Sequence, residues 1–167
     1  MGDEGLKVSI IVPHYDQKEC LERLFPTIAA QIYRNFEVIV VDNCTPDASA
    51  ISLIRDFIKD KPYMHLVQNP SFTHLAGTCN EGIKLAKGEY LCFLNAETEL
   101  ESTFIQRNVE ILDNDPGIGG LTCSIIDQYK KTLFAGGLFA RGLTWLMQDG
   151  FEGTRPVEFI DFTAAFY

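Results

Sequence analysis

The sequence predicts an α/β fold with a mainly parallel central sheet, helices on both faces, and a mixed or antiparallel extension at the C-terminal end. Two observations carry this prediction. Runs of β-branched and aromatic residues alternate with helix-like segments as far as residue 112, an order typical of parallel strands. After residue 117 the pattern changes to short strands separated by turns that contain glycine, which favours antiparallel pairing.

The expected elements follow from the spacing of the apolar residues. Four mainly apolar runs have the length of buried strands, and the segments between them carry apolar residues at helical spacing. Pro13 is expected to end the first strand, whereas Pro26 falls inside the first helix and conflicts with its hydrogen bonding. Asp47 is the expected N-cap of the second helix. The expected strands are 8–12, 36–41, 64–67 and 89–94, and the expected helices are 19–31, 47–59, 76–86 and 103–112.

The last part of the chain predicts a different kind of structure. Short strands are expected at 118–126, 132–139 and 157–162, with a loop at 141–156 that holds Trp145. No linker separates this part from the first, so we expect a single domain over residues 1–167, with halves at 1–100 and 101–167. The sequence stops within an apolar run, FIDFTAAFY, and we expect the chain to be a piece of a longer protein.

The charge balance limits the classes of partner. The formal net charge is -9 at pH 7, which argues against nucleic-acid binding because phosphate backbones are held by Lys and Arg. An acidic protein that binds a diphosphate usually needs a cation between the two, and a hard divalent cation takes oxygen ligands.

The cysteines and the apolar segments indicate a compartment. Five cysteines without a CxxC pair fit reduced thiols better than a disulfide framework or a zinc site. The first residues, MGDEGLK, lack the apolar region of a signal peptide, and no run approaches the roughly 20 apolar residues of a spanning helix. We therefore expect a soluble, cytoplasmic chain, and peripheral association of a longer parent with the inner face of the membrane stays open.

Polar side chains follow all four strands that are expected in the first part. Because the carboxyl ends of parallel strands lie on one edge of a sheet, and open α/β sheets bind ligands at that edge, we expect these side chains to converge on a ligand. They are His14 and Tyr15, Asp42 and Asn43, Gln68 and Asn69, and Asn95 and Glu97.

Two of these positions have both a functional and an ordinary interpretation. Asn95 and Glu97 are spaced i, i+2 and can point to one side, where their oxygens and a diphosphate would suit Mg²⁺ or Mn²⁺. The alternative is a turn followed by the acids of a helix start. Asp42 either accepts hydrogen bonds from a ribose or a base, or caps a turn. Neither G-x-G-x-x-G nor a P-loop is present, so a nucleotide would be bound without a glycine cradle.

Three segments of the chain resemble the family 2 inverting glycosyltransferases with the GT-A fold. They are VSIIVPHYDQKECLERLFPTIAAQIYRNFEVIVVDNCTPD, NPSFTHLAGTCNEGIKLAKGEYLCFLNAETEL and GGLTCSIIDQYKKTLFAGGLF, and the third is similar to the branch that includes rhamnosyltransferases of bacterial surface polysaccharides. The resemblance covers most of the chain. It implies a Rossmann-like fold for nucleotide-diphospho-sugar transfer, a nucleotide-sugar donor, Mg²⁺ or Mn²⁺, and transfer with inversion to a saccharide or lipid-linked acceptor.

The resemblance also implies the site residues. Pro13, His14 and Tyr15 would form a wall of the nucleotide pocket, and Asp42 would recognise the base or the ribose. Glu97, together with Asn95, would hold the metal at the two ends of the family's D-x-D motif. The implied donor-binding set is Pro13, His14, Tyr15, Asp42, Asn69, Gly77, Asn80 and Asn95.

The sequence departs from the family pattern in three ways. The D-x-D motif is N-A-E here, and the family often has Gly and Arg where His74 and Cys79 stand. The acidic general base of the family would lie beyond residue 167, so we expect this chain alone to bind a donor but to transfer sugar poorly. Two alternatives remain: a degenerate, non-catalytic module that binds nucleotide sugars, and, less favoured, a nucleotidyltransferase, which needs a Gly-rich or basic phosphate-holding stretch that we do not find.

Overall fold

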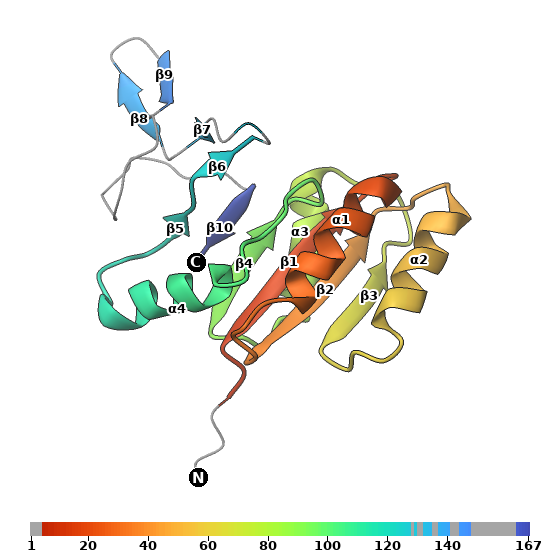
Figure 1. Ribbon diagram of the computed structural model, residues 1–167. Coiled ribbons are helices and arrows are strands. Elements are labelled where there is room, and N and C mark those ends of the chain that lie inside the picture. The colour runs from red at the N-terminus through yellow and green to blue at the C-terminus, as the bar shows by residue number, and fades with distance from the viewer. Residues whose placement is uncertain (1–4, 128, 130–131, 135–136, 141–143, 148–162) are drawn as a thin grey trace.

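The computed structural model describes residues 5–127, 129, 132–134, 137–140, 144–147 and 163–167 (Figure 1). Its main feature is a six-stranded sheet with the strand order β3-β2-β1-β4-β10-β5. The first four strands in this order run parallel, and β10 runs antiparallel to both β4 and β5. The predicted α/β class, with a mainly parallel sheet and an antiparallel C-terminal extension, is confirmed.

The elements follow one another in the predicted alternation. The helices are α1 (Lys18–Ala29), α2 (Ala48–Ile58), α3 (Leu75–Ile83) and α4 (Phe104–Asn114). The sheet strands are β1 (Val8–His14), β2 (Phe36–Asp42), β3 (Met64–Gln68), β4 (Tyr90–Leu94), β5 (Leu121–Thr122) and β10 (Ala164–Phe166), and two short hairpins consist of β6 (Ile125–Ile126) with β7 (Thr132–Phe134) and β8 (Gly137–Ala140) with β9 (Thr144–Met147).

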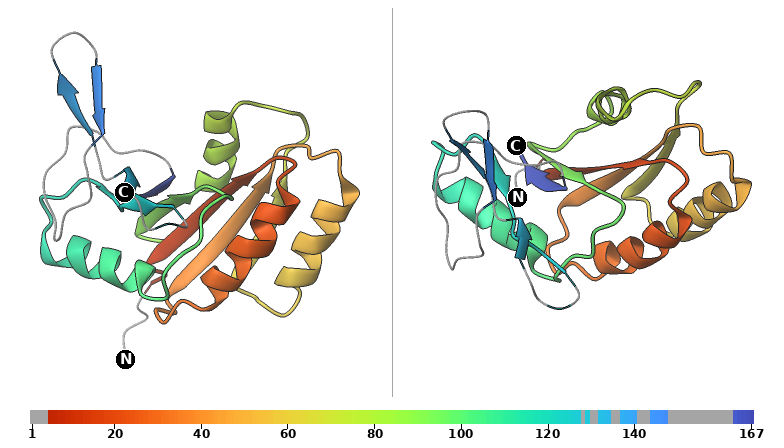
Figure 2. Two further views of the ribbon diagram at one scale, coloured as in Figure 1. Left: turned by 45° about the horizontal axis from the view of Figure 1, so that its top comes forward. Right: turned by 90° about the horizontal axis from the view of Figure 1, so that it is seen from above.

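Helices cover both faces of the parallel part of the sheet. Seen from above, α3 lies on one face, and α1, α2 and α4 lie on the other (Figure 2). Alternate residues of each strand point to opposite faces, so Ile10 and Val12 of β1 pack in the larger core while Ile11 packs in the smaller one. All seven residues of β2 are buried, as expected for a strand with neighbours on both sides and helices on both faces.

Pro13 does not end β1, contrary to the sequence prediction. The carbonyl of His14 accepts a hydrogen bond from the backbone N–H of Asn43 on the β2 side, so the preceding residue directs its backbone toward β4. The pairing of β1 with β4 stops at Ile11 and Phe93. Within the described residues, no strand pairs with β1 on this side beyond Ile11, so the missing N–H of Pro13 costs no ladder hydrogen bond.

One prediction for the C-terminal part needs revision. Trp145 lies in strand β9, opposite Phe139 of β8, and not in a loop. β-Favoured residues on both strands explain this pairing, and the sequence pattern predicts only one of the two strands. The third expected strand, at 157–162, lies outside the described residues, and the strand that joins the sheet is Ala164–Phe166.

Pro26 is accommodated inside α1, which continues to Ala29. Asp47 caps α2 as predicted, because its carboxylate accepts the backbone N–H of Ser49 at 2.8 Å. Within the described residues, no helix has the length and apolar character needed to cross a bilayer.

Candidate functional site

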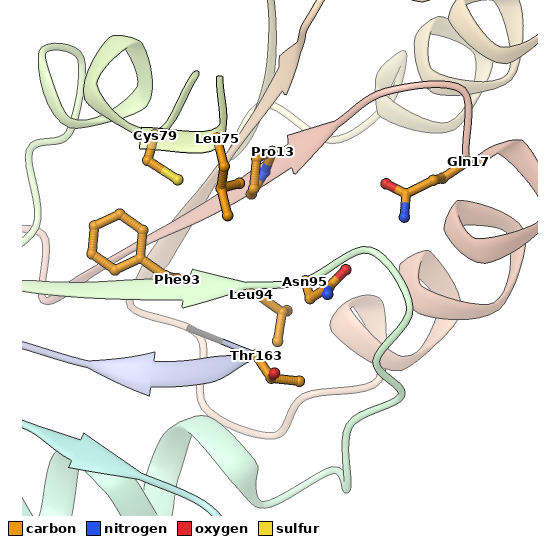
Figure 3. Close-up of a pocket in the computed structure, with 8 residues that line it drawn as sticks. All are labelled: Pro13, Gln17, Leu75, Cys79, Phe93, Leu94, Asn95 and Thr163. Atoms are coloured by element: carbon orange, nitrogen blue, oxygen red, sulfur yellow. The ribbon is translucent and has the colours of Figure 1, made fainter. Parts of the chain in front are cut away.

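A crevice opens where β1 and β4 separate. β1 stays paired with β2 up to His14 and Asp42, whereas its pairing with β4 ends three residues earlier, at Ile11 and Phe93. A cavity of about 340 Å³ lies at this point (Figure 3). It is lined by Pro13, Gln17, Leu75, Cys79, Phe93, Leu94, Asn95 and Thr163. Helix α1, which follows β1, and helix α3, which follows β3, lie on opposite faces of the sheet. Open α/β sheets bind their ligands in such a crevice, at the carboxyl ends of the strands.

Two exposed aromatic rings stand at the same edge of the sheet. Tyr15 follows β1, and Phe72 lies in the loop between β3 and α3; their ring centroids are 5.0 Å apart in an edge-on arrangement. Both side chains are largely exposed, at 45% and 64%. The sequence indicates Tyr15 but not Phe72, because the contact joins two loops that are far apart along the chain.

Asp42 is buried and holds two hydrogen bonds. Its Oδ1 accepts the backbone N–H of Thr45 at 3.0 Å, and its Oδ2 accepts the Nε2 of Gln68 at 3.4 Å. The hydroxyl of Thr45 in turn accepts the backbone N–H of Asp16 at 3.0 Å. The loops after β1 and β2 are therefore connected through Thr45, directly beside the Asp42 carboxylate.

Each of these two loops contains a left-handed residue that is not glycine. Asp16 has a φ of 51° and Cys44 a φ of 65°. The short polar side chain of Asp16 tolerates the left-handed region. Cys44 is restrained in this conformation by its thiol, which donates a hydrogen bond to the carbonyl of Asn69 at 3.1 Å. Such conformations persist where the surroundings enforce them, and they cluster at ligand sites.

His14 occupies an unusual position beneath these loops. The side chain is buried, and neither ring nitrogen has a hydrogen-bond partner within the described part of the chain. Burial lowers the pKa of His14 below its usual value, although the nearby carboxylates of Asp42 and Asp16 act in the opposite direction. The imidazole is therefore held as a neutral ring beside Asp42.

A network of amides connects the loops after β2 and β3. The Oδ1 of Asn43 accepts from the Nδ2 of Asn69 at 3.1 Å and from the backbone N–H of Thr73 at 3.0 Å, and its Nδ2 donates to the carbonyl of Thr73 at 2.6 Å. The Oδ1 of Asn69 is buried and has no partner among the described residues. The predicted site residue Asn69 thus keeps one acceptor unused.

The start of α3 depends on Gly77 and His74. His74 is the N-cap, and its Nδ1 accepts the backbone N–H of Gly77 at 3.3 Å. A Cβ at Gly77 would lie 2.5 Å from the hydroxyl of Thr73, so only glycine fits without a shift. Asn80 lies on the same helix but is exposed and is not among the residues that line the cavity.

Asn95 and Glu97 form a turn at the end of β4. The Oδ1 of Asn95 accepts the backbone N–H of Glu97 at 3.2 Å, and the backbone N–H of Thr98 donates to the carbonyl of Asn95 at 3.1 Å. The Oε1 of Glu97 accepts from the Nε2 of Gln17 at 3.3 Å, a bond that connects the two sides of the crevice. The backbone N–H of Asn95 donates to the carbonyl of Thr163, which fixes the turn against β10.

The chain matches the profile of "Glycosyl transferase family 2" over residues 9–156. It belongs to glycosyltransferase family 2. Among its relatives is the amylovoran biosynthesis glycosyltransferase AmsB of Erwinia amylovora, 30% identical over 120 residues that cover 70% of this chain and 39% of the relative. Another is the UDP-Glc:alpha-D-GlcNAc-diphosphoundecaprenol beta-1,3-glucosyltransferase WfaP of Escherichia coli, 27% identical over 65% of this chain and 42% of the relative. The chain therefore spans less than half the length of either relative.

Solved structures of glycosyltransferases share the fold. The mannosyltransferase PcManGT of Pyrobaculum calidifontis, in complex with GDP-Man and Mn²⁺, superposes with a TM-score of 0.67 at 25% identity, covering 72% of this chain and 36% of the other. The S. aureus protein TarS 1-349, in complex with UDP-GlcNAc, superposes with a TM-score of 0.60 at 23% identity, covering 65% of this chain and 31% of the other. The predicted GT-A-type fold is confirmed.

Cys79 and Glu97 can be compared with the residues that the family resemblance leads us to expect at their positions. Cys79 stands where the sequence resemblance expects Arg; it lines the cavity, and burial raises the pKa of its thiol, so the group stays neutral. Glu97 stands where the sequence resemblance expects the second acid of a metal motif. No group of three or more His, Cys, Asp and Glu side chains that could hold a metal occurs within the described residues.

The donor chemistry of this turn nevertheless fits a hard cation. Glu97 supplies a carboxylate and Asn95 an amide oxygen, which are the ligand types of Mg²⁺ and Mn²⁺. Because the amide oxygen already accepts one backbone N–H, it can offer only its second lone pair. These two protein oxygens would leave the rest of the coordination of such a cation to other oxygen ligands.

Proposed function

We propose that this chain is the donor-binding part of a metal-dependent, inverting glycosyltransferase that transfers a sugar from a nucleotide diphosphate to a saccharide or lipid-linked acceptor in bacterial surface polysaccharide synthesis. The observation that supports it most strongly is the convergence of polar strand ends beside the β1–β4 crevice in a family 2 fold. The rhamnosyltransferase-like branch, suggested by the segment at 119–139, belongs to the same proposal.

In this proposal the chain's own groups hold the donor. The Asp42 carboxylate accepts a hydrogen bond from the base or the ribose, and Tyr15 offers an exposed aromatic face to the base. Gln17 and Asn95 present amides to the cavity. Asn69 and Asn80 remain proposed donor contacts, Gly77 shapes the loop that ends at α3, and Pro13 and His14 support the wall behind Tyr15.

Glu97 and Asn95 are the proposed holders of Mg²⁺ or Mn²⁺. A divalent cation bound there would neutralise charge on the departing nucleotide diphosphate, which is Lewis-acid assistance. The complex of the similar mannosyltransferase PcManGT with GDP-Man and Mn²⁺ supports this part of the proposal. Gln17 fixes one oxygen of Glu97 and thereby restrains its position at the mouth of the crevice.

In this proposal the acceptor is bound by residues that follow the donor-binding half of the chain. We place the general base beyond residue 167, with residues 1–100 binding the nucleotide sugar and residues 101–167 forming part of the acceptor side. The diphosphoundecaprenol in the name of WfaP supports a lipid-linked acceptor. Such an acceptor would bring the whole enzyme to the cytoplasmic face of the membrane as a peripheral protein.

Calorimetry with UDP, GDP and dTDP, each with Mn²⁺ and with EDTA, tests the proposal. We expect Mn²⁺ to strengthen the binding of at least one nucleotide about tenfold or more, because the cation links the diphosphate to an acidic chain. The Glu97→Ala variant should lose this metal-dependent gain. Glu99→Ala is the matched control, because Glu99 lies two residues further on and pairs with Arg23 at 3.6 Å. Equal losses in the two variants would contradict the assignment of Glu97.

A non-catalytic module that binds nucleotide sugars is the second candidate. The engagement of the Asn95 amide oxygen in its own turn favours it, because this weakens an already small metal-ligand set. The two candidates differ in one result: a module would bind the nucleotide equally well with Mn²⁺ and with EDTA. Turnover assays on this chain and on a longer parent separate them further, since only the enzyme proposal expects activity from the parent.

A further inference from the structure

A chain of hydrogen bonds leads from helix α2 to the carboxylate of Asp42. The guanidinium of Arg55 donates from NH2 to the Oε1 of Gln68 at 2.9 Å. The Nε2 of Gln68 donates to the Oδ2 of Asp42 at 3.4 Å. Arg55 and Gln68 are exposed, whereas Asp42 is only 2% exposed. The chain of contacts therefore runs from the surface to a buried acceptor at the nucleotide edge of the sheet.

The chemistry of the two ends determines the orientation of the Gln68 amide. A guanidinium can only donate hydrogen bonds, and an ionised carboxylate can only accept them. The amide is suited to bridge them, because its oxygen accepts on one side while its NH₂ group donates on the other. A glutamate at position 68 would still accept from Arg55 but would place two carboxylates against each other.

The second oxygen of Asp42 is fixed from the opposite side. Its Oδ1 accepts the backbone N–H of Thr45 at 3.0 Å, and Thr45 is itself connected to the loop after β1 through Asp16. The register pairs Asp42 with His14 on one side and with Gln68 on the other, so the three side chains lie in a row on one face of the sheet. Each carboxylate oxygen keeps a lone pair for a ligand.

We propose that Gln68 and Arg55 are positioning residues of the nucleotide site, which hold the Asp42 carboxylate in the orientation that accepts a hydrogen bond from the ribose or base. This inference rests on the proposed function, in which Asp42 contacts the nucleotide. It adds two residues, from the edge strand β3 and from α2, that do not themselves touch the ligand.

Binding of the nucleoside diphosphate that the wild-type chain prefers, measured by calorimetry with Mn²⁺, tests the inference. At pH 8, Gln68→Glu should weaken binding about tenfold through carboxylate repulsion, and Gln68→Ala and Arg55→Ala about threefold through the lost bonds. Two changes on α4 are the controls. Gln106→Glu also places a carboxylate beside an acid, since Gln106 donates to Glu110 at 2.7 Å, and Arg107→Ala removes an exposed guanidinium that pairs with Glu101 at 3.7 Å. Both controls should bind within about twofold of wild type.

A pH series separates positioning from a structural effect. In Gln68→Glu, acid protonates the introduced carboxylate and restores a donor toward Asp42, so the loss of affinity should shrink at pH 5. Among the described residues, Arg55 on α2 contacts Gln68, and His14 on β1 interacts electrostatically with Asp42 and with Asp16 in the following loop. All three groups are kept in both proteins being compared. The loss in Gln68→Ala should not depend on pH.

The outcomes distinguish this inference from the proposed function. Suppose that Asp42→Asn weakens nucleotide binding. If Gln68→Glu then binds like wild type, or loses the same affinity at pH 5 as at pH 8, the positioning role is wrong and the proposed nucleotide site stands. If the wild-type chain binds no nucleoside diphosphate, both are wrong. Loss in Gln68→Glu that recovers in acid, with unchanged controls, supports the inference.

Discussion

At the scale of single residues, His14 shows how the edge of the sheet differs from an ordinary core. Its imidazole is 2% exposed, and both nitrogens lack partners within the described residues. A buried donor or acceptor without a partner costs about 1–3 kcal/mol. The same burial lowers the pKa of His14, because a charged ring would lose its hydration there. The unpartnered imidazole lowers the stability of the fold, so we interpret His14 as a residue of the candidate site and not as an ordinary core residue.

Replacing His14 with leucine tests this interpretation. At pH 8 we expect His14→Leu to keep or raise the free energy of unfolding by about 1 kcal/mol, because the unpartnered nitrogens are gone. In the wild type, the pKa of His14 is lower in the folded chain than in the unfolded chain, so the unfolded state binds more protons between the two values. Stability is therefore full above about pH 6.5 and falls as the pH drops through the folded pKa, by at most about 1.4 kcal/mol per pH unit.

Urea denaturation of both proteins between pH 5 and 8 provides the measurement. His65 and His74 are present in both, so the difference between the two curves isolates His14. Parallel curves, with the same slope below pH 6.5, would show that His14 is not the depressed group.

At the scale of elements, the site depends on how closely α3 packs on the sheet. Gly82 makes this approach possible, because a Cβ there would lie 2.6 Å from Cγ2 of Ile11 and 3.2 Å from Cγ2 of Val41. α3 carries Leu75 and Cys79 into the cavity, so a displacement of the helix would change the cavity wall. The capping by His74 and the packing of Gly82 together place this wall.

The Gly82→Ala variant should be destabilised by about 1–2 kcal/mol, because overpacking outweighs the gain in helix propensity. Gly119→Ala is the control, since a Cβ there meets nothing within 4 Å, and its stability should change by less than about 0.5 kcal/mol. In a double-mutant cycle, Ile11→Ala should relieve part of the cost, so the double variant should be more stable than the sum of the single changes predicts. If the changes in stability caused by Gly82→Ala and Ile11→Ala simply add, the strain in Gly82→Ala does not arise from contact with Ile11.

At the scale of the whole molecule, charge and topology act together. β1 and β4 are neighbours in the sheet, and they separate after Ile11 and Phe93. The crevice between them therefore lies at the carboxyl edge of the four parallel strands. The chain carries a net charge of -9, and Asp16, Asp42 and Glu97 lie at this edge. A diphosphate therefore approaches a surface of its own sign unless a cation accompanies it.

Salt should therefore affect binding with opposite signs in two conditions. In EDTA, raising NaCl from about 20 to about 200 mM should strengthen the binding of a nucleoside diphosphate about twofold, because salt screens like-charge repulsion. In Mn²⁺ the same change should weaken binding, because salt then screens attraction between the bound cation and the diphosphate. Calorimetry over a series of salt concentrations would measure both slopes. A loss of affinity with salt in EDTA would reveal a positive local potential that the net charge conceals.

Much of the parallel part of the fold could be predicted, because its signals are local. β-Branched runs, the helical spacing of apolar residues and the Asp47 cap each lie within a few neighbouring residues. The rule that parallel strands share a carboxyl edge then places Asp42 beside His14 and Gln68, as the register confirms. The prediction for Pro13 is wrong because the tolerance of a proline at this position depends on where β4 stops pairing.

The sequence by itself therefore determined the α/β class, the alternation of elements and the edge on which the polar residues gather. Only the tertiary structure decided that Phe72 meets Tyr15, that Thr45 connects Asp16 to Asp42, and that Arg55 reaches Asp42 through Gln68. It also decided that β10 joins the sheet between β4 and β5. The physical reason is range: periodicity and capping act between near neighbours, whereas these contacts join loops and strands whose separation in space is set by the order of strands in the sheet.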